Sequence, residues 1–201
     1  MIDIISDEAF ERIKLILHGV PGGAERALHG VISRATTTMK ASSVKDITAI
    51  YDIKEKYVRD GRNTAIQTKT RRVDGGVIGT IQYAGNQIPL IRFGVSHKTP
   101  RPGKAVRAQQ RKDRGKTAFS NAYVANLGRG MGVFERATSR RASSFQLMGV
   151  STAQMAANSD VLEKAEAAAQ ETIAKRTEHE ITRILQGSEG DRCHQLYCLN
   201  A

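Results

Sequence analysis

The sequence has no tryptophan, only two cysteines among its 201 residues, and no long hydrophobic run. Aromatic residues make up 5% of the chain, so few side chains are suited to stacking on exposed bases. No apolar stretch approaches the roughly 18 residues of a membrane-spanning helix, so we expect no membrane partner. The acidic N-terminus lacks the basic start of a secretory signal. Cys193 and Cys198 are too few for a disulfide framework, and the sequence assigns them no role.

The charge of the chain is strongly biased to one sign, with 31 Lys and Arg against 20 Asp and Glu and a net charge of +11. Residues 97–116 alone contain eight Lys or Arg and one Asp, and so hold a net charge of +7. Clustered cations attract anions and release counterions, which indicates a contact surface for phosphates or an acidic partner. A solvated charge run without a partner is the alternative. The candidate contact residues are Lys98, Arg101, Lys104, Arg107, Arg111, Lys112, Arg114 and Lys116.

Apolar residues at helical spacing predict three main helical regions. The first spans residues 7–17 and is stopped by Gly19 and Pro21. The second begins near Ala24, and its pattern weakens at Ser42 and Ser43, so we expect residues 44–57 to form one or two short helical turns. Its apolar face comprises Ala27, Leu28, Val31, Ile32, Ala35 and Met39.

The last and clearest helix follows a capping box formed by Ser151 and Gln154 and is predicted to end at Gly187. Glu171 and Lys175 are spaced to form a favourable pair along it. Its apolar face comprises Leu162, Ala165, Ala169, Ile173, Thr177, Ile181 and Ile184.

The middle of the chain changes to strand-like alternation. Residues 65–73, 77–83 and 88–95 predict a three-stranded meander, with a turn at 74–76 and with Pro89 at an edge or bulge. Residues 118–127 and 133–138 predict two further strands. Regular patterning is lost between Ser96 and Lys116, which we interpret as a long functional loop.

These elements predict an α+β fold, in which N-terminal helices and a long C-terminal helix pack on an antiparallel sheet. We expect a single domain over residues 1–187, with the basic loop 96–116 inserted in it. Residues 188–201 show no periodicity and are expected to form a peripheral tail.

The sequence offers little support for catalysis or for a bound cofactor. Residues 115–117 resemble the end of a phosphate-binding P-loop, but Gln110 stands where that motif requires its first glycine. Cys193, His194 and Cys198 supply three metal ligands without a fourth. We therefore expect a protein that is not an enzyme and holds no cofactor and no metal.

Several short motifs follow one another between about residues 20 and 187. They are Pro21-Gly22-Gly23-Ala24, Ile50-Tyr51-Asp52-Ile53-Lys54, Ile88-Pro89-Leu90, Val133-Phe134-Glu135-Arg136, Leu147-Met148-Gly149-Val150-Ser151 and the helix end His179–Leu185. In this order the motifs resemble the minor tail protein Z family, the tail-completion proteins of long-tailed bacteriophages. Many members of that family have a proline at the position of Val150.

The resemblance implies a structural virion protein, made in the host cytoplasm and built into the tail or neck at its head-proximal end. It further implies a homohexameric ring that matches the sixfold tail tube. The partners it implies are the tail tube or tail terminator, other neck proteins and the tape-measure protein. The basic loop would then meet DNA in the ring lumen, the tape-measure protein or a neighbouring subunit.

A nonspecific nucleic-acid-binding protein is the alternative function. No helix-turn-helix, zinc-finger or RNP pattern is present, so such binding would use the nucleic-acid backbone without sequence specificity. The two functions differ in stoichiometry and in salt dependence, since a nucleic-acid binder loses affinity steeply as salt rises.

Overall fold

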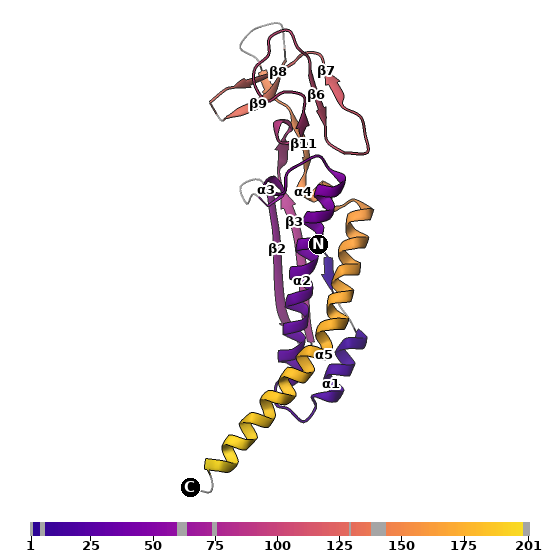
Figure 1. The fold of residues 1–201 in the computed structure, drawn as a ribbon, viewed down its shortest axis with the longest axis vertical. Helices are drawn as coiled ribbons and strands as arrows, with labels where there is room; N and C mark the ends of the chain where they lie inside the picture. Colours follow the sequence, from indigo (N-terminus) through magenta and orange to yellow (C-terminus); the bar gives the residue numbers. More distant parts are fainter. Residues whose placement is uncertain are drawn as a thin grey trace. The chain divides into compact units, whose positions relative to one another are not determined.

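The computed structural model describes residues 2–4, 7–59, 64–73, 76–128, 130–137 and 144–198, with the side chains of residues 2–4, 7, 8, 64, 65 and 188–198 excluded. The chain combines helices with antiparallel sheets, which confirms the predicted α+β class. It divides into two compact units, and the chain passes between them within its longest elements. Unit 1 comprises residues 1–42, 67–82 and 163–201, and unit 2 comprises residues 43–66 and 83–162. Figure 1 labels the helices and the longer strands.

Unit 1 contains a three-stranded sheet with the strand order β1-β3-β2. Its strands belong to β1 (Ile2–Ile4), β2 (Thr64–Val73) and β3 (Gly76–Gly85). The sequence prediction missed β1, which pairs antiparallel with β3 through Ile2 and Ile81. The prediction that residues 88–95 form the third strand of a meander is wrong, because β1 occupies the second edge of β3.

Three helices complete unit 1: α1 (Asp7–Ile16), the first part of α2 (Gly23–Ile50) and most of α5 (Ser159–Cys198). All six residues of the predicted apolar face of α2 are buried. Helix α2 runs alongside β3 (Figure 1). The two approach so closely at Gly79 that a Cβ there would lie 2.5 Å from Ile32 Cγ2. It approaches α5 at Gly30, where a Cβ would lie 3.0 Å from the Glu180 carboxyl carbon. Glycine therefore permits both contacts.

Helix α2 continues to Ile50, so the prediction of a break at Ser42 and Ser43 is wrong. Val44 and Ile47 are fully buried and extend the apolar face beyond the two serines. The Ser43 hydroxyl lies 2.6 Å from the Tyr83 hydroxyl, which satisfies its polar atom inside unit 2. Burial also raises the pKa of Tyr83, although the Ser43 hydrogen bond opposes this shift.

The long C-terminal helix differs from its prediction at both ends. Ser151 and Gln154 do form the capping box, but it caps the separate short helix α4 (Thr152–Ala156). Helix α5 begins at Ser159 and runs to Cys198, so the predicted end at Gly187 is wrong. The expectation that residues 188–201 form a peripheral tail stays a prediction. The predicted apolar face is buried from Ala165 to Ile184. Glu171 and Lys175 pair at 2.5 Å as predicted.

Unit 2 is built from short strands around the end of α2 and the one-turn helix α3 (Glu55–Val58). One sheet has the order β10-β9-β8, formed by β8 (Ala122–Asn126), β9 (Met131–Arg136) and β10 (Ser144–Gln146). A second pairs β4 (Gln87–Pro89) with β11 (Met148–Ser151). The third has the order β5-β6-β7, formed by β5 (Gly94–Val95), β6 (Val106–Gln109) and β7 (Thr117–Phe119). Strands β4 and β5 are separated by a 3₁₀ turn at Leu90–Arg92.

Candidate functional site

The basic segment 96–116 is anchored at its centre by strand β6. Val106 and Ala108 are buried on one face of this strand, while Arg107 between them is exposed on the other. Strand β6 pairs with β5 on one side and with β7 on the other. The prediction of an unpatterned loop is therefore wrong for residues 106–109. Arg107 is held exposed on a sheet, and the other predicted cations precede or follow strand β6.

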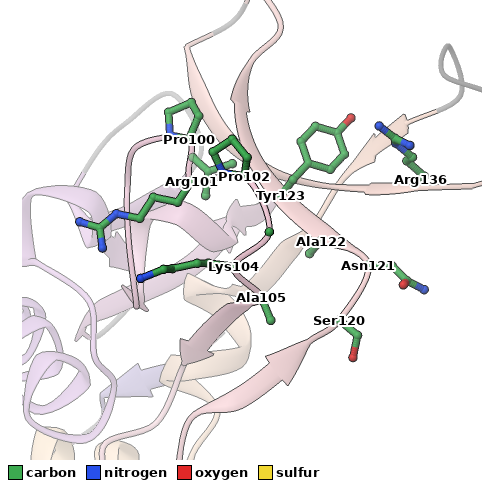
Figure 2. A pocket seen from close by; sticks show the side chains of 12 residues that line it. Pro100, Arg101, Pro102, Lys104, Ala105, Ser120, Asn121, Ala122, Tyr123 and Arg136 are labelled. Carbon is green, nitrogen blue, oxygen red and sulfur yellow. The ribbon is translucent and has the colours of Figure 1, made fainter.

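The turn before β6 brings Arg101 and Lys104 together. The Lys104 amide donates to the Arg101 carbonyl at 3.3 Å, which closes a four-residue turn. Pro102 fixes the second position, and Gly103 adopts φ +74° at the third. A type II turn requires this combination, and it holds the first and fourth Cα atoms within about 7 Å of each other. In Figure 2 the charged ends of Arg101 and Lys104 extend to the same side.

The turn after β6 compensates the charge of Arg111. Its guanidinium donates two hydrogen bonds of 2.9 Å to the Asp113 carboxylate and lies 5.6 Å from the centre of the Tyr51 ring. This pairing lowers the pKa of Asp113 and raises the pKa of Arg111, chiefly through the side-chain hydrogen bonds. Both groups stay ionised near neutral pH, so Arg111 offers little free charge to a partner.

Lys112 binds the C-terminal end of helix α2. Its backbone amide donates to the Ile50 carbonyl at 2.8 Å, and its ammonium donates to the Thr48 carbonyl at 2.6 Å. The last turn of α2 has no basic residue of its own. A cation at this position is favourable because the carbonyls at a helix C-terminus carry partial negative charge. Lys112 therefore has a structural role that the sequence did not indicate.

Replacing Lys112 with methionine is expected to lower the free energy of unfolding by about 1 kcal/mol, because the Thr48 carbonyl loses its charged donor. Urea denaturation followed by circular dichroism measures the change. Lys116→Met is the matched control, since Lys116 is exposed and makes no ion pair within the described residues. Equal denaturation midpoints for the two variants would contradict this role of Lys112.

The other six predicted contact residues form no ion pair, although the charge of Arg114 helps to lower the pKa of the nearby Asp113 carboxyl. All are exposed, and within the part of the chain that the structure describes none forms an ion pair. Because these side chains are exposed, a polyanion can reach each of them without rearrangement of the sheet. These residues are Lys98, Arg101, Lys104, Arg107, Arg114 and Lys116.

A groove of about 820 Å³ lies between the turn before β6 and strand β8 (Figure 2). Three of its lining side chains are cationic, and none is acidic. One of the three, Arg136, was not among the predicted contact residues, since its position at the end of β9 gave no sign that it would lie near residues 100–105. The lining residues are Pro100, Arg101, Pro102, Gly103, Lys104, Ala105, Ser120, Asn121, Ala122, Tyr123, Val124 and Arg136.

The side chain of Tyr123 is fixed on the groove wall. Its hydroxyl lies 2.6 Å from the Ser144 hydroxyl, and the Arg136 guanidinium lies 5.8 Å from its ring centre. The Phe134 ring is 6.2 Å away at an interplanar angle of 34°. Neighbouring side chains therefore already engage the ring and the hydroxyl of the groove's one aromatic residue.

Four of the quoted sequence motifs come together inside unit 2, three through direct hydrogen bonds and the fourth through Phe93, which follows Leu90 in the chain. The Leu90 amide donates to the Leu147 carbonyl at 3.0 Å, and the Leu147 amide donates to the Val133 carbonyl at 2.8 Å. Ile53 of a further motif forms a β-bridge with the buried Phe93. These segments lie far apart in the sequence, yet they build one core.

The structure explains the residue type at two positions of the motif Leu147–Ser151. A Cβ on Gly149 would lie 2.5 Å from the Phe93 ring, so only glycine leaves room for that ring. The Ser151 hydroxyl accepts a hydrogen bond of 3.2 Å from the backbone amide of Gln154 and so caps α4. Gly149 therefore serves packing of the core, and Ser151 serves capping of helix α4.

Among the described side chains, no group of three or more His, Cys, Asp or Glu is placed to hold a metal ion. The side chains of Cys193, His194 and Cys198 lie outside that set, so the expectation of no metal stays a prediction. No helix within the described ranges is both long and apolar enough to cross a membrane. No protein-family model, curated protein or solved structure matches the chain.

Proposed function

We propose that this chain is a structural, non-catalytic subunit of a bacteriophage tail that acts in tail completion or neck assembly. The observation that carries the proposal is the meeting of four motifs in the core of unit 2. The sequence resemblance depends on these motifs, and their place in the core gives them a common structural role.

Exposed apolar side chains on both units support subunit contacts. On α1, Leu15 is 82% exposed and Ile16 is 41% exposed, whereas Leu127 and Phe145 are 55% and 48% exposed in unit 2. A closed ring uses a heterologous interface, in which one patch meets a different patch on the next subunit. Two separate sets of apolar side chains provide candidates for the two sides of such an interface.

In this proposal the protein is a virion component of the neck, and its ring matches the sixfold tail tube. Its partners are the tail tube or tail terminator, other neck proteins and the tape-measure protein. The six free cations would lie where DNA, the tape-measure protein or a neighbouring subunit can reach them. Nonspecific nucleic-acid binding is the second candidate function, and the same six cations favour it.

The mass of the purified protein in solution tests the proposal. We expect a species near six times the 22.0 kDa of one chain that persists at high salt and without DNA. Leu15→Ser combined with Phe145→Ser is expected to dissociate it, because the variant removes one apolar anchor from each unit. Thr99→Ser, at an exposed polar position, is the control.

A different result would favour the second candidate. A chain that stays monomeric, binds duplex DNA tightly at low salt and releases it at high salt would contradict the ring proposal. Light scattering coupled to size-exclusion chromatography, run with and without DNA, separates the two outcomes.

A further inference from the structure

Strand β2 is an edge strand of the sheet in unit 1. In the order β1-β3-β2 it pairs with β3 on one side, and no strand among the described residues pairs with its other side. In Figure 1 β2 forms the left margin of this sheet. An edge strand presents a row of N–H and C=O groups that a further strand can bind. Strand β2 therefore has backbone hydrogen-bonding capacity on the side away from β3.

The residues along this edge are open to solvent. Successive residues of a strand direct their backbone groups alternately toward the strands on its two sides. Six of the seven residues 67–73 are exposed, and the seventh, Thr70, is half-buried. Whichever alternate set points away from β3, its residues are accessible. The described chain therefore does not cover this edge.

The length and composition of β2 favour strand addition. Proteins commonly protect a sheet edge with a very short strand, with proline or with a covering helix or loop. Strand β2 has ten residues and contains neither proline nor glycine. It is rich in threonine and other β-branched residues, which fit a pleated strand. The protective feature that it does have is positive charge, which restricts the type of strand that can pair with it.

The charge on β2 is entirely positive. Its charged residues are Lys69, Arg71 and Arg72, and it contains no Asp or Glu. Glu25 of α2 lies 3.9 Å from Arg72, whereas Lys69 and Arg71 form no ion pair within the described part of the chain. Lys69 and Arg71 are two residues apart, so they lie on the same face of the strand. Two uncompensated cations thus stand side by side along the edge.

This charge selects an acidic strand and disfavours a second copy of β2. Two β2 strands placed side by side would bring cations close to cations, and like charges that face each other across strands are destabilising. A strand with carboxylates at alternate positions places them opposite Lys69 and Arg71, where the pairing is favourable. A nucleic acid also neutralises cations, but its phosphodiester backbone has no N–H donors for a ladder. Residues 64–73 also contain no aromatic side chain on which a base could stack.

We propose that the free edge of β2 binds an extended acidic segment of a partner protein, which adds as a further strand to the sheet of unit 1. Its backbone forms a hydrogen-bonded ladder with β2, and its alternate carboxylates pair with Lys69 and Arg71. This site goes beyond the ring proposal. The exposed apolar side chains and the six free cations on which that proposal draws all lie outside residues 67–73.

Fluorescence anisotropy with a labelled peptide of roughly eight residues, alternating Glu and Thr, tests the proposal. We expect saturable binding to the full chain. Lys69→Glu combined with Arg71→Glu is expected to weaken it by about tenfold or more, because two attractive charges become repulsive. Arg34→Glu combined with Lys164→Glu makes the same change in net charge at exposed positions of α2 and α5, and we expect it to change the affinity by less than about threefold. Circular dichroism checks that each variant is folded.

Two N-methylated peptides separate strand addition from general attraction between charges. A strand that adds to one edge directs only its alternate amides toward that edge. One peptide has N-methyl groups on its glutamates and the other has them on its threonines, and both retain the full charge. We expect one of the two to bind and the other not to bind. Hydrogen exchange measured by mass spectrometry locates the site, because the unmodified peptide should slow exchange within residues 67–73.

Several outcomes would overturn the proposal. Absence of peptide binding is the first. Binding of both methylated peptides or of neither, or equal losses in the two charge-reversal variants, is the second, since strand addition would not explain it. Slowed exchange only outside residues 67–73 would assign the peptide to another surface, and protection of this segment that is lost when an oligomer dissociates would assign the edge to a second copy. The ring proposal is tested separately by the mass in solution, so the two can fail independently.

Discussion

Replacing Phe93 with alanine is expected to lower the free energy of unfolding of unit 2 by about 3–5 kcal/mol. Phe93 is 1% exposed, forms a β-bridge with Ile53 and packs directly on the backbone at Gly149. Removal of its ring takes away buried apolar surface and leaves a cavity that the surrounding short strands can fill only in part. Urea denaturation followed by tyrosine fluorescence reports on this unit, since four of the five tyrosines lie in it and the chain has no tryptophan.

The contact between Phe93 and Gly149 can be tested by a double-mutant cycle. Gly149→Ala alone is expected to cost about 1–3 kcal/mol, because its Cβ would overlap the Phe93 ring. In the Phe93→Ala background the same change should cost close to nothing, since the ring is absent. Phe119→Ala is the control for aromatic truncation, and because Phe119 is only half-buried we expect a smaller loss than for Phe93→Ala. Additive effects at positions 93 and 149 would contradict direct packing of the Phe93 ring on Gly149.

Neutralising the six free cations is expected to abolish any binding of duplex DNA. If all six contact phosphates, the logarithm of the binding constant should fall with the logarithm of salt concentration with a slope of roughly −5. Affinity of the unmodified protein would then drop by about 10³-fold between about 50 and 200 mM salt, so binding would be weak under physiological conditions. The test variant replaces Lys98, Arg101, Lys104, Arg107, Arg114 and Lys116 with glutamine.

A matched variant distinguishes this surface from the net charge of the whole protein. It neutralises six other exposed cations and so lowers the net charge by the same amount. The control positions are Arg34, Lys45, Lys54, Lys69, Arg71 and Lys164. We expect the control variant to keep most of its DNA affinity and nearly the same salt slope. Similar losses in both variants would show that overall charge, and not the residues around β6, determines binding.

The parts of the fold that depend on local periodicity were predicted well. The apolar face of α2 was identified residue by residue, and so was most of the face of α5, because burial on a helix repeats every three to four residues. Capping by Ser151 and the Glu171–Lys175 pair also followed from short spacings. In each case the interacting groups lie within one or two helical turns of each other.

Strand pairing was predicted poorly because the choice of partner is not local. Residues 88–95 have the composition of a strand, yet β4 pairs with β11 about sixty residues further along the chain. The edge of β3 that a third strand would have used belongs to β1. Strand β6 was missed because two buried residues, Val106 and Ala108, are too short an alternation to stand out among so many charges.

The same difference applies to the candidate site. From the sequence alone, the concentration of positive charge between residues 97 and 116, the helical faces and the α+β class could all be determined, since each is a property of composition or of short spacings. The tertiary structure decided which cations are free, because Asp113 neutralises Arg111 and the end of α2 binds Lys112. It also placed Arg136 in the lining of the same groove as Arg101 and Lys104. Charge compensation and strand pairing depend on distances in space between residues far apart in the chain, and only the folded chain sets those distances.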